Sequence, residues 1–164
     1  HFVLCGKEVD HNNLALLSMV REVSASSRIH LMGERRDIER IMAALDIAAS
    51  SSCSEGFPNV VGEAMSSGVP CVVTAVSDLP EIVGATGRVV PPRDSAALAA
   101  ALEELIALGP SGRQALGAAA RSRVIERYSL ESSVAQYESI YESIRPQFAN
   151  CEDILLSDAV QNIT

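Results

Sequence analysis

Short apolar or β-branched runs alternate with helical patterns in the first half of this 164-residue chain. Between these runs, apolar residues recur at helical spacing, as at Leu14, Leu17, Val20 and Val23. Such alternation predicts βαβ units, and the lack of polar alternation within the runs predicts that helices bury both faces of a parallel sheet. We therefore expect an α/β fold with a Rossmann-like, doubly wound parallel sheet, whose strands are predicted at residues 2–5, 28–32, 46–50, 70–74 and 88–90.

Beyond residue 90 the pattern becomes helical. Asp94, Ser111 and Ser129 are residue types that open helices, because their side-chain oxygens accept hydrogen bonds from free amides of the first turn. We expect C-terminal helices over residues 96–108, 112–127 and 130–144.

Pro146 is expected to end the last helix. Residues 1–145 are thus predicted to form one domain, and residues 146–164 a tail that is poorly ordered or docked on a missing partner. We also hypothesise that two surfaces drive self-association of the chain: an exposed rim that would face a companion domain, and an apolar stripe on the last helix. The stripe consists of Val134, Tyr137, Ile140 and Tyr141.

Composition and charge exclude several classes of protein. The apolar runs are too short to span a bilayer. The 13 basic and 21 acidic residues give a net charge of −8, which offers no face for nucleic acid. Arginines form two local groups that we expect to be solvated, namely Arg35, Arg36 and Arg40, and Arg121, Arg123 and Arg127.

The four cysteines match no metal-binding or redox spacing, so we interpret them as reduced thiols of a cytoplasmic protein. Cys5 and Cys71 lie in strand-like runs and are expected to be buried as small apolar residues. No metal-ligand cluster is recognisable in the sequence, and no metal is expected.

Ligands of open α/β sheets bind at the carboxyl ends of the strands. The segments after the predicted strands are therefore expected to line one rim, and they comprise residues 6–8, 33–36, 51–59 and 75–80.

The third of these segments is the richest in potential ligand contacts. Pro58 suits the first turn of a helix, and Gly56 lets a ligand approach the backbone. The free amides of Asn59, Val60 and Val61 would then point out of the helix N-terminus and offer a site for a phosphate or another anion.

Two glutamates bracket this helix start. Glu63 lies about one turn into the helix, and Glu55 precedes the turn on the loop side. A carboxylate beside an anion site is repulsive unless it accepts hydrogen bonds from hydroxyl groups, as a ribose diol would offer. Either glutamate alone is better explained as a surface charge near a helix start, whereas the pair favours a sugar-binding role.

The motifs around this pair resemble those of a known family. In chain order they are EGFPNVVGEAM from Glu55, SGVPCVVT from Ser67, LPEIV from Leu79, TGRVVPP from Thr86 and RYSL from Arg127. This series resembles the donor-binding, C-terminal half of the retaining, nucleotide-sugar-dependent glycosyltransferases of family 4. The resemblance implies half of the two-Rossmann-domain GT-B architecture, and a hexosyltransferase-type enzyme of bacterial-like glycan biosynthesis.

The resemblance also implies roles for residues in the third segment. Glu55 would be the catalytic-site residue near the donor sugar, orienting hydroxyls without attacking the sugar. Glu63 would bind the ribose hydroxyls of a nucleoside-diphosphate-sugar donor, and no other cofactor is implied. The turn would hold sugar and phosphate oxygens through Gly56, Phe57, Pro58, Asn59 and Val60.

Two earlier loops match the family less completely. Gly33, Glu34 and Arg35 match a loop that contacts the nucleobase through its backbone. Gly6 matches a glycine at the end of the family's second C-domain strand, but Gly-Lys-Glu replaces the usual Gly-x-Gly.

Residues 1–6 resemble the second strand of the family's C-domain, so the first strand and helix, with their diphosphate-binding Arg and Lys, are predicted to be missing. We interpret Lys7 as a solvated loop residue and not as a replacement cation. The N-terminal domain, which would bind a sugar or lipid-linked acceptor, is also predicted to be missing, so the chain alone should be inactive. The full-length protein is expected in the cytoplasm. Any contact with the inner face of the membrane would be made by that missing domain.

Two alternatives come from other classes. A signalling or nucleotide-binding module on a similar sheet would need an acidic cluster, a phosphorylatable Asp and a partner Lys, but Lys7 is the sole lysine and Ser50 to Ser52 end the third strand. Another GT-B enzyme, such as a nucleotide-sugar epimerase, would share the sheet without the paired glutamates.

Overall fold

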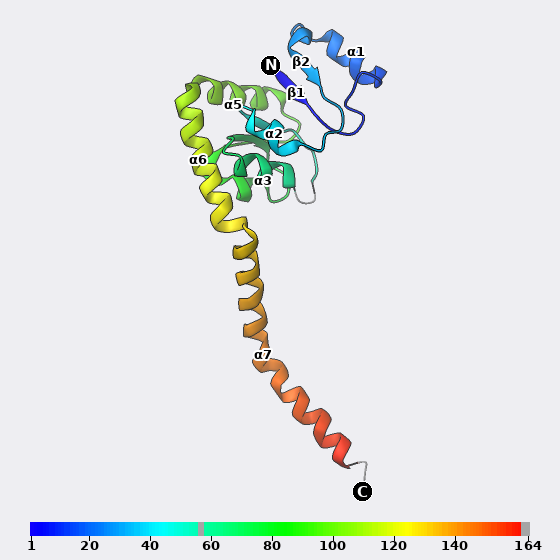
Figure 1. The fold of residues 1–164 in the computed structure, drawn as a ribbon, viewed down its shortest axis with the longest axis vertical. Helices are drawn as coiled ribbons and strands as arrows, with labels where there is room; N and C mark the ends of the chain where they lie inside the picture. The colour runs from blue at the N-terminus through cyan, green and yellow to red at the C-terminus, as the bar shows by residue number, and fades with distance from the viewer. Residues whose placement is uncertain (56–57, 162–164) are drawn as a thin grey trace. The chain divides into compact units, whose positions relative to one another are not determined.

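The computed structural model describes residues 1–55 and 58–161, with side chains described through residue 145 (Figure 1). The chain divides into two compact units, His1–Ala44 and Leu45–Thr164. Each unit contains its own parallel sheet flanked by helices, and each is described separately below.

The first unit pairs two short strands in parallel, with Val3 opposite His30. The imidazole nitrogens of His1 and His30 lie 2.9 Å apart on exposed side chains. The helix between the strands is capped by Asn13, whose side chain accepts a hydrogen bond from the Leu16 amide at 3.1 Å. The elements are β1 (Phe2–Leu4), α1 (Leu14–Glu22), the 3-10 helix η1 (Ser26–Arg28), β2 (Ile29–Leu31) and α2 (Ile38–Ala43).

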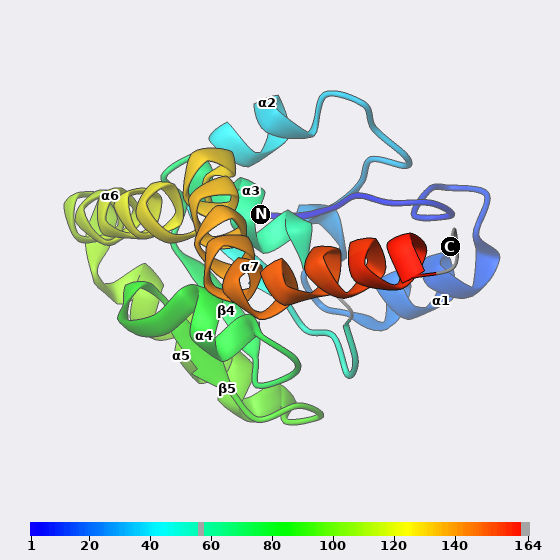
Figure 2. The same ribbon diagram turned by 90° about the horizontal axis from the view of Figure 1, so that it is seen from below.

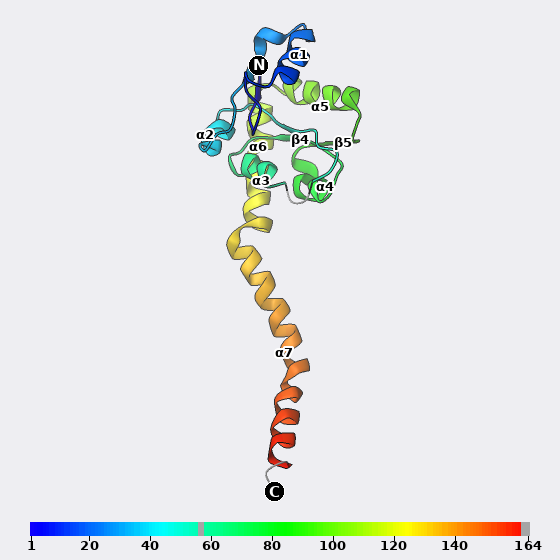
Figure 3. The same cartoon turned by 90° about the vertical axis from the view of Figure 1, so that its right-hand side faces the viewer.

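The second unit contains a parallel sheet of order β3-β4-β5. Helix α5 covers one face of this sheet, and α3 and α4 cover the other (Figure 3). This arrangement confirms the doubly wound α/β class. The elements are β3 (Ala48–Ser50), α3 (Asn59–Ser66), β4 (Cys71–Thr74), α4 (Leu79–Val83), η2 (Gly84–Thr86), β5 (Arg88–Val90), α5 (Ser95–Ala107), α6 (Gly109–Tyr128) and α7 (Leu130–Gln161).

The core of the second unit forms around β4, whose four residues are all buried. Val72 packs in a cluster with Val90 and Leu105, so α5 is held to the sheet by apolar contact. Burial of the whole strand explains why its sequence lacks polar alternation.

Helix α6 approaches the α3–β4 turn at Gly117. A Cβ atom at this position would collide with the carbonyl oxygen of Gly68. Farther along α6, Arg121 donates to the Ser66 carbonyl at the end of α3, and the Nε atom of Arg123 donates to the Ile82 carbonyl in α4 at 2.9 Å. Arg121 is exposed, as expected, but both arginines also satisfy carbonyls at helix ends that lack intrahelical partners.

The predicted strands lie in two parallel sheets among the described residues. Two predictions about helices need correction. Helix α6 begins at Gly109, before the predicted start near Gly112, because Pro110 fits its first turn. Helix α7 continues past Pro146 to Gln161, because a proline inside a helix removes one hydrogen bond and need not end the helix.

The predicted caps of α5 and α7 are confirmed. The Asp94 carboxylate accepts from the Ala97 amide at 2.9 Å, and the Ser129 hydroxyl accepts from the Ser132 amide at 3.1 Å. Figure 2 views the same elements from below, where α7 runs from the middle of the view toward its right-hand side. No helix within the described part of the chain combines the length and apolar character needed to cross a membrane.

Candidate functional site

Two strand ends converge on the loop that carries Glu55. The loop follows β3, and the hydroxyl of Ser52 donates a hydrogen bond to Oε1 of Glu55. Thr74, the last residue of β4, is 3% exposed, and its hydroxyl donates to the Ser52 carbonyl at 2.6 Å. The carboxyl ends of β3 and β4 therefore place Ser52, Glu55 and Thr74 together.

Helix α3 begins at Asn59, whereas the sequence predicts its start near Phe57 or Pro58. Gly56 and Phe57 lie outside the described residues, and Pro58 takes the N-cap position with a ψ angle of 73°, outside the helical range. The Val61 amide donates to the Pro58 carbonyl at 3.0 Å and is not free, contrary to expectation. The amides of Asn59 and Val60 make no hydrogen bond to any described residue, so the start of α3 keeps two open donors.

Glu63 and Val60 both lie on the exposed part of α3. With Glu55 half-buried on the preceding loop, the start of α3 combines open amide donors with carboxylate acceptors. Such a combination can bind a ligand that carries both an anionic group and hydroxyl groups.

In the first unit, the loops after β1 and β2 are joined through Gly33. Its carbonyl accepts from the Gly6 amide at 2.9 Å and from the Cys5 thiol at 3.2 Å, and its own amide donates to Val9 at 2.8 Å. Gly33 has a φ of 67°, a conformation that favours glycine. Two predicted site residues, Gly6 and Gly33, are thereby brought into direct contact.

Cys5 was predicted to be buried, but its side chain is exposed, because β1 ends at Leu4 and the thiol lies in the loop. Cys71, by contrast, is buried within β4 as predicted, and burial raises the pKa of its thiol to about 12. Cys71 thus stays neutral and has no nucleophilic role at physiological pH.

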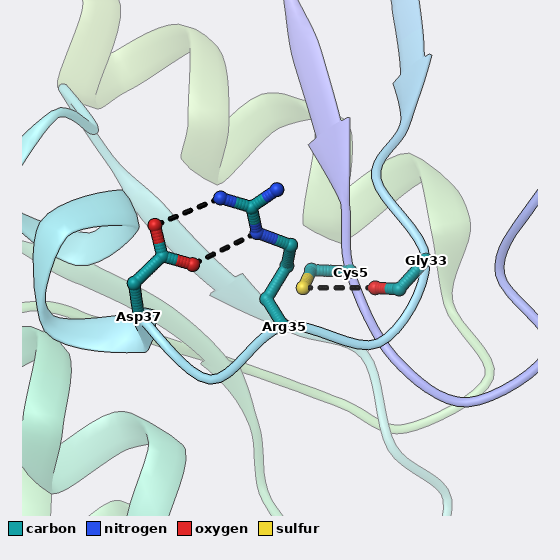
Figure 4. A network of polar contacts seen from close by, with 4 residues as sticks. All are labelled: Cys5, Gly33, Arg35 and Asp37. Carbon is teal, nitrogen blue, oxygen red and sulfur yellow. Dashed lines mark hydrogen bonds and ion pairs between the residues drawn. The ribbon is translucent and has the colours of Figure 1, made fainter.

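Arg35 forms a two-pronged ion pair with Asp37, with both N–H···O distances at 2.8 Å (Figure 4). The hydrogen bond from Arg35 lowers the pKa of the Asp37 carboxyl, and Asp37 in turn raises the pKa of Arg35. The backbone amides and carbonyls of Glu34 and Arg35 make no hydrogen bonds within the described residues. The loop after β2 therefore presents open backbone groups beside a fixed guanidinium.

Sequence reasoning missed Ser52, Thr74 and Asp37. For Asp37 a local signal existed, since a carboxylate two residues after Arg35 can pair with it. Thr74 lies 22 residues from Ser52, and no local pattern indicates their contact. No group of three or more His, Cys, Asp or Glu side chains within the described ranges could hold a metal ion.

Comparison with known proteins gives matches over most of the chain. A family model described as "Glycosyl transferases group 1" matches residues 1–107. The chain is 30% identical over 131 residues to N-acetyl-alpha-D-glucosaminyl L-malate synthase of Bacillus anthracis, covering 79% of this chain and 34% of that protein. It is 33% identical over 138 residues to MMP alpha-(1->4)-mannosyltransferase of Mycolicibacterium hassiacum, covering 81% of this chain and 33% of that protein.

Solved structures share the fold. Sucrose-phosphate synthase from Thermosynechococcus elongatus matches with a TM-score of 0.75 and 26% identity, over 88% of this chain and 38% of that one. Anabaena Alr3699/HepE in complex with UDP matches with a TM-score of 0.76 and 25% identity, over 86% and 40%. The chain spans about a third of the length of these curated relatives. With the GT-B fold of its structural neighbours and a family match over most of its length, the chain belongs to the glycosyl transferases group 1 family.

Proposed function

We propose that this chain is the donor-binding part of an enzyme that transfers a hexose from a nucleoside-diphosphate sugar to an acceptor with retention of configuration. The observation that carries the proposal is the start of α3, where the open amides of Asn59 and Val60 lie between Glu55 and Glu63 in the sequence. Open amides suit a diphosphate, and the carboxylates suit sugar and ribose hydroxyls.

The proposed chemistry assigns separate roles to these groups. Amide donors at the start of α3 stabilise the negative charge that develops on the departing diphosphate. Glu55 accepts hydrogen bonds from the donor sugar, and Glu63 accepts them from the ribose. The open backbone of Glu34 and Arg35 supports a contact with the nucleobase. Because HepE is described in complexes with UDP and with UDP-glucose, UDP is the first nucleotide to test.

Other parts of the proposal concern the whole enzyme. We infer that residues 1–145 form the C-terminal, nucleotide-sugar-binding domain of a GT-B enzyme. The acceptor would bind to the other domain of a cytoplasmic enzyme.

The proposed function is tested by titrating the chain with UDP, GDP and ADP while following backbone amide shifts. We expect weak binding that moves the Asn59 and Val60 signals, and a weaker response to 2′-deoxy-UDP than to UDP. Glu63→Gln should abolish this preference for the ribose hydroxyl, because an amide is a poorer acceptor than a carboxylate. Glu81→Gln, a change elsewhere on the surface, is the matched control. Shifts confined to other regions would reject the proposal.

We further propose that the apolar stripe of α7 makes the isolated chain self-associate. Tyr137, Ile140 and Tyr141 are 63%, 55% and 64% exposed, so a large apolar surface faces solvent on one helix. Sedimentation velocity should show a rising average mass with concentration, and Ile140→Lys should suppress it. A monomer at all concentrations would contradict the proposal.

A further inference from the structure

Among the described residues, only one oxygen of the Glu55 carboxylate has a hydrogen-bond partner. Its Oε1 atom accepts from the Ser52 hydroxyl, and no described residue donates to Oε2 or forms an ion pair with this carboxylate. A half-buried carboxylate usually finds a cation or several donors, since burial without partners is costly. Here the Ser52 hydroxyl fixes one oxygen, and the described residues leave the other open.

The backbone of Ser52, whose hydroxyl holds Glu55, is itself fixed to the sheet. The register of β3 and β4 sets Ser50 opposite Val73, so the chain beyond Ser50 runs beside Thr74. The Thr74 hydroxyl donates its one proton to the Ser52 carbonyl at 2.6 Å, while the Ser52 hydroxyl donates its one proton to Glu55. Because Thr74 is 3% exposed, water does not compete for this bond.

We propose that Ser52 and Thr74 are positioning residues that aim the open oxygen of Glu55 at a hydroxyl of the donor sugar. This inference rests on the proposed function, and it extends the site from the glutamate to the strand end behind it. The buried β4 strand is the rigid support. One hydrogen bond runs from Thr74 to Ser52, and a second runs from Ser52 to Glu55. Directional hydrogen bonds to a charged group provide geometric specificity as well as energy.

Removing the hydroxyl of Ser52 or of Thr74 tests this positioning role in the ligand-free chain. Ser52→Ala and Thr74→Val should leave the Glu55 side chain free to rotate, seen by NMR as averaged couplings and merged γ-methylene signals. Ser54→Ala is the matched control, because Ser54 is exposed on the same loop and has no hydrogen bond to a described residue. Ser52→Thr and Thr74→Ser retain the hydroxyls and should keep the Glu55 side chain in one orientation. Unchanged Glu55 couplings in Ser52→Ala would overturn the proposal.

A second measurement separates positioning from a merely structural role. The ratio of UDP-glucose to UDP affinity should fall by about threefold to tenfold in Ser52→Ala, since the sugar loses an oriented acceptor, while UDP affinity stays unchanged. Equal losses for both ligands, or a lower Tm with the ratio intact, would assign the serine to stability alone. If the unaltered chain binds neither ligand, the proposed function fails, and the ligand-free couplings still decide the positioning.

Discussion

At the scale of single residues, the pair formed by Arg35 and Asp37 gives a pH-dependent prediction. The hydrogen bond from Arg35 lowers the pKa of Asp37 below its usual 3.8. A carboxyl whose pKa is lower in the folded state contributes stability above the unfolded pKa, and this contribution disappears as the pH falls through the folded pKa. We expect the Asp37 carboxyl signal to titrate by NMR below pH 3.8, and at a higher pH in Arg35→Ala than in the unaltered chain.

The variant Arg35→Lys tests whether the two-pronged hydrogen bonding of Arg35 lowers the pKa of Asp37. An ammonium group lacks the planar fork that engages both carboxylate oxygens, so its effect on Asp37 should be intermediate. The same titration midpoint in all three proteins would show that the ion pair does not persist in solution.

At the scale of elements, replacing a helical glycine by alanine should have opposite effects on the free energy of unfolding at Gly117 and at Gly62. Gly117→Ala places a Cβ against the Gly68 carbonyl, which must shift, so we expect a loss of roughly 1–3 kcal/mol in the free energy of unfolding. Gly62→Ala on α3 meets nothing within 4 Å and should gain about 0.5–1 kcal/mol, because alanine loses less backbone entropy than glycine. Urea denaturation measures both changes. An unchanged free energy of unfolding in Gly117→Ala would mean that α6 does not pack so closely against the α3–β4 turn.

At the scale of the whole molecule, we expect the 164-residue chain to bind donor without transferring its sugar. The chain spans about a third of the length of its curated relatives, and we propose that the acceptor binds to a part of the enzyme outside this chain. Assays with UDP-glucose and simple sugar acceptors should give no product above the uncatalysed background. Product formation that disappears in Glu55→Gln would contradict this expectation.

The sequence by itself determined the positions of β1 to β5, the α/β class and the caps Asp94 and Ser129. These features are local, because hydrophobic period, β-branched content and helix capping act within a few residues. It also determined the family, since motifs read in chain order need no knowledge of contacts. The short helix α4 was missed, because its few residues after Asp78 provide too little periodic signal.

Only the tertiary structure decided which distant groups meet. The Thr74 hydroxyl reaches Ser52, Arg121 and Arg123 reach carbonyls of α3 and α4, and Arg113 reaches Asp46 at 3.1 Å across 67 residues. Strand register and the close approach of α6 at Gly117 set these contacts. A hydrogen bond depends on separations of tenths of an ångström, and those separations arise from the packing of whole elements, which no local pattern encodes.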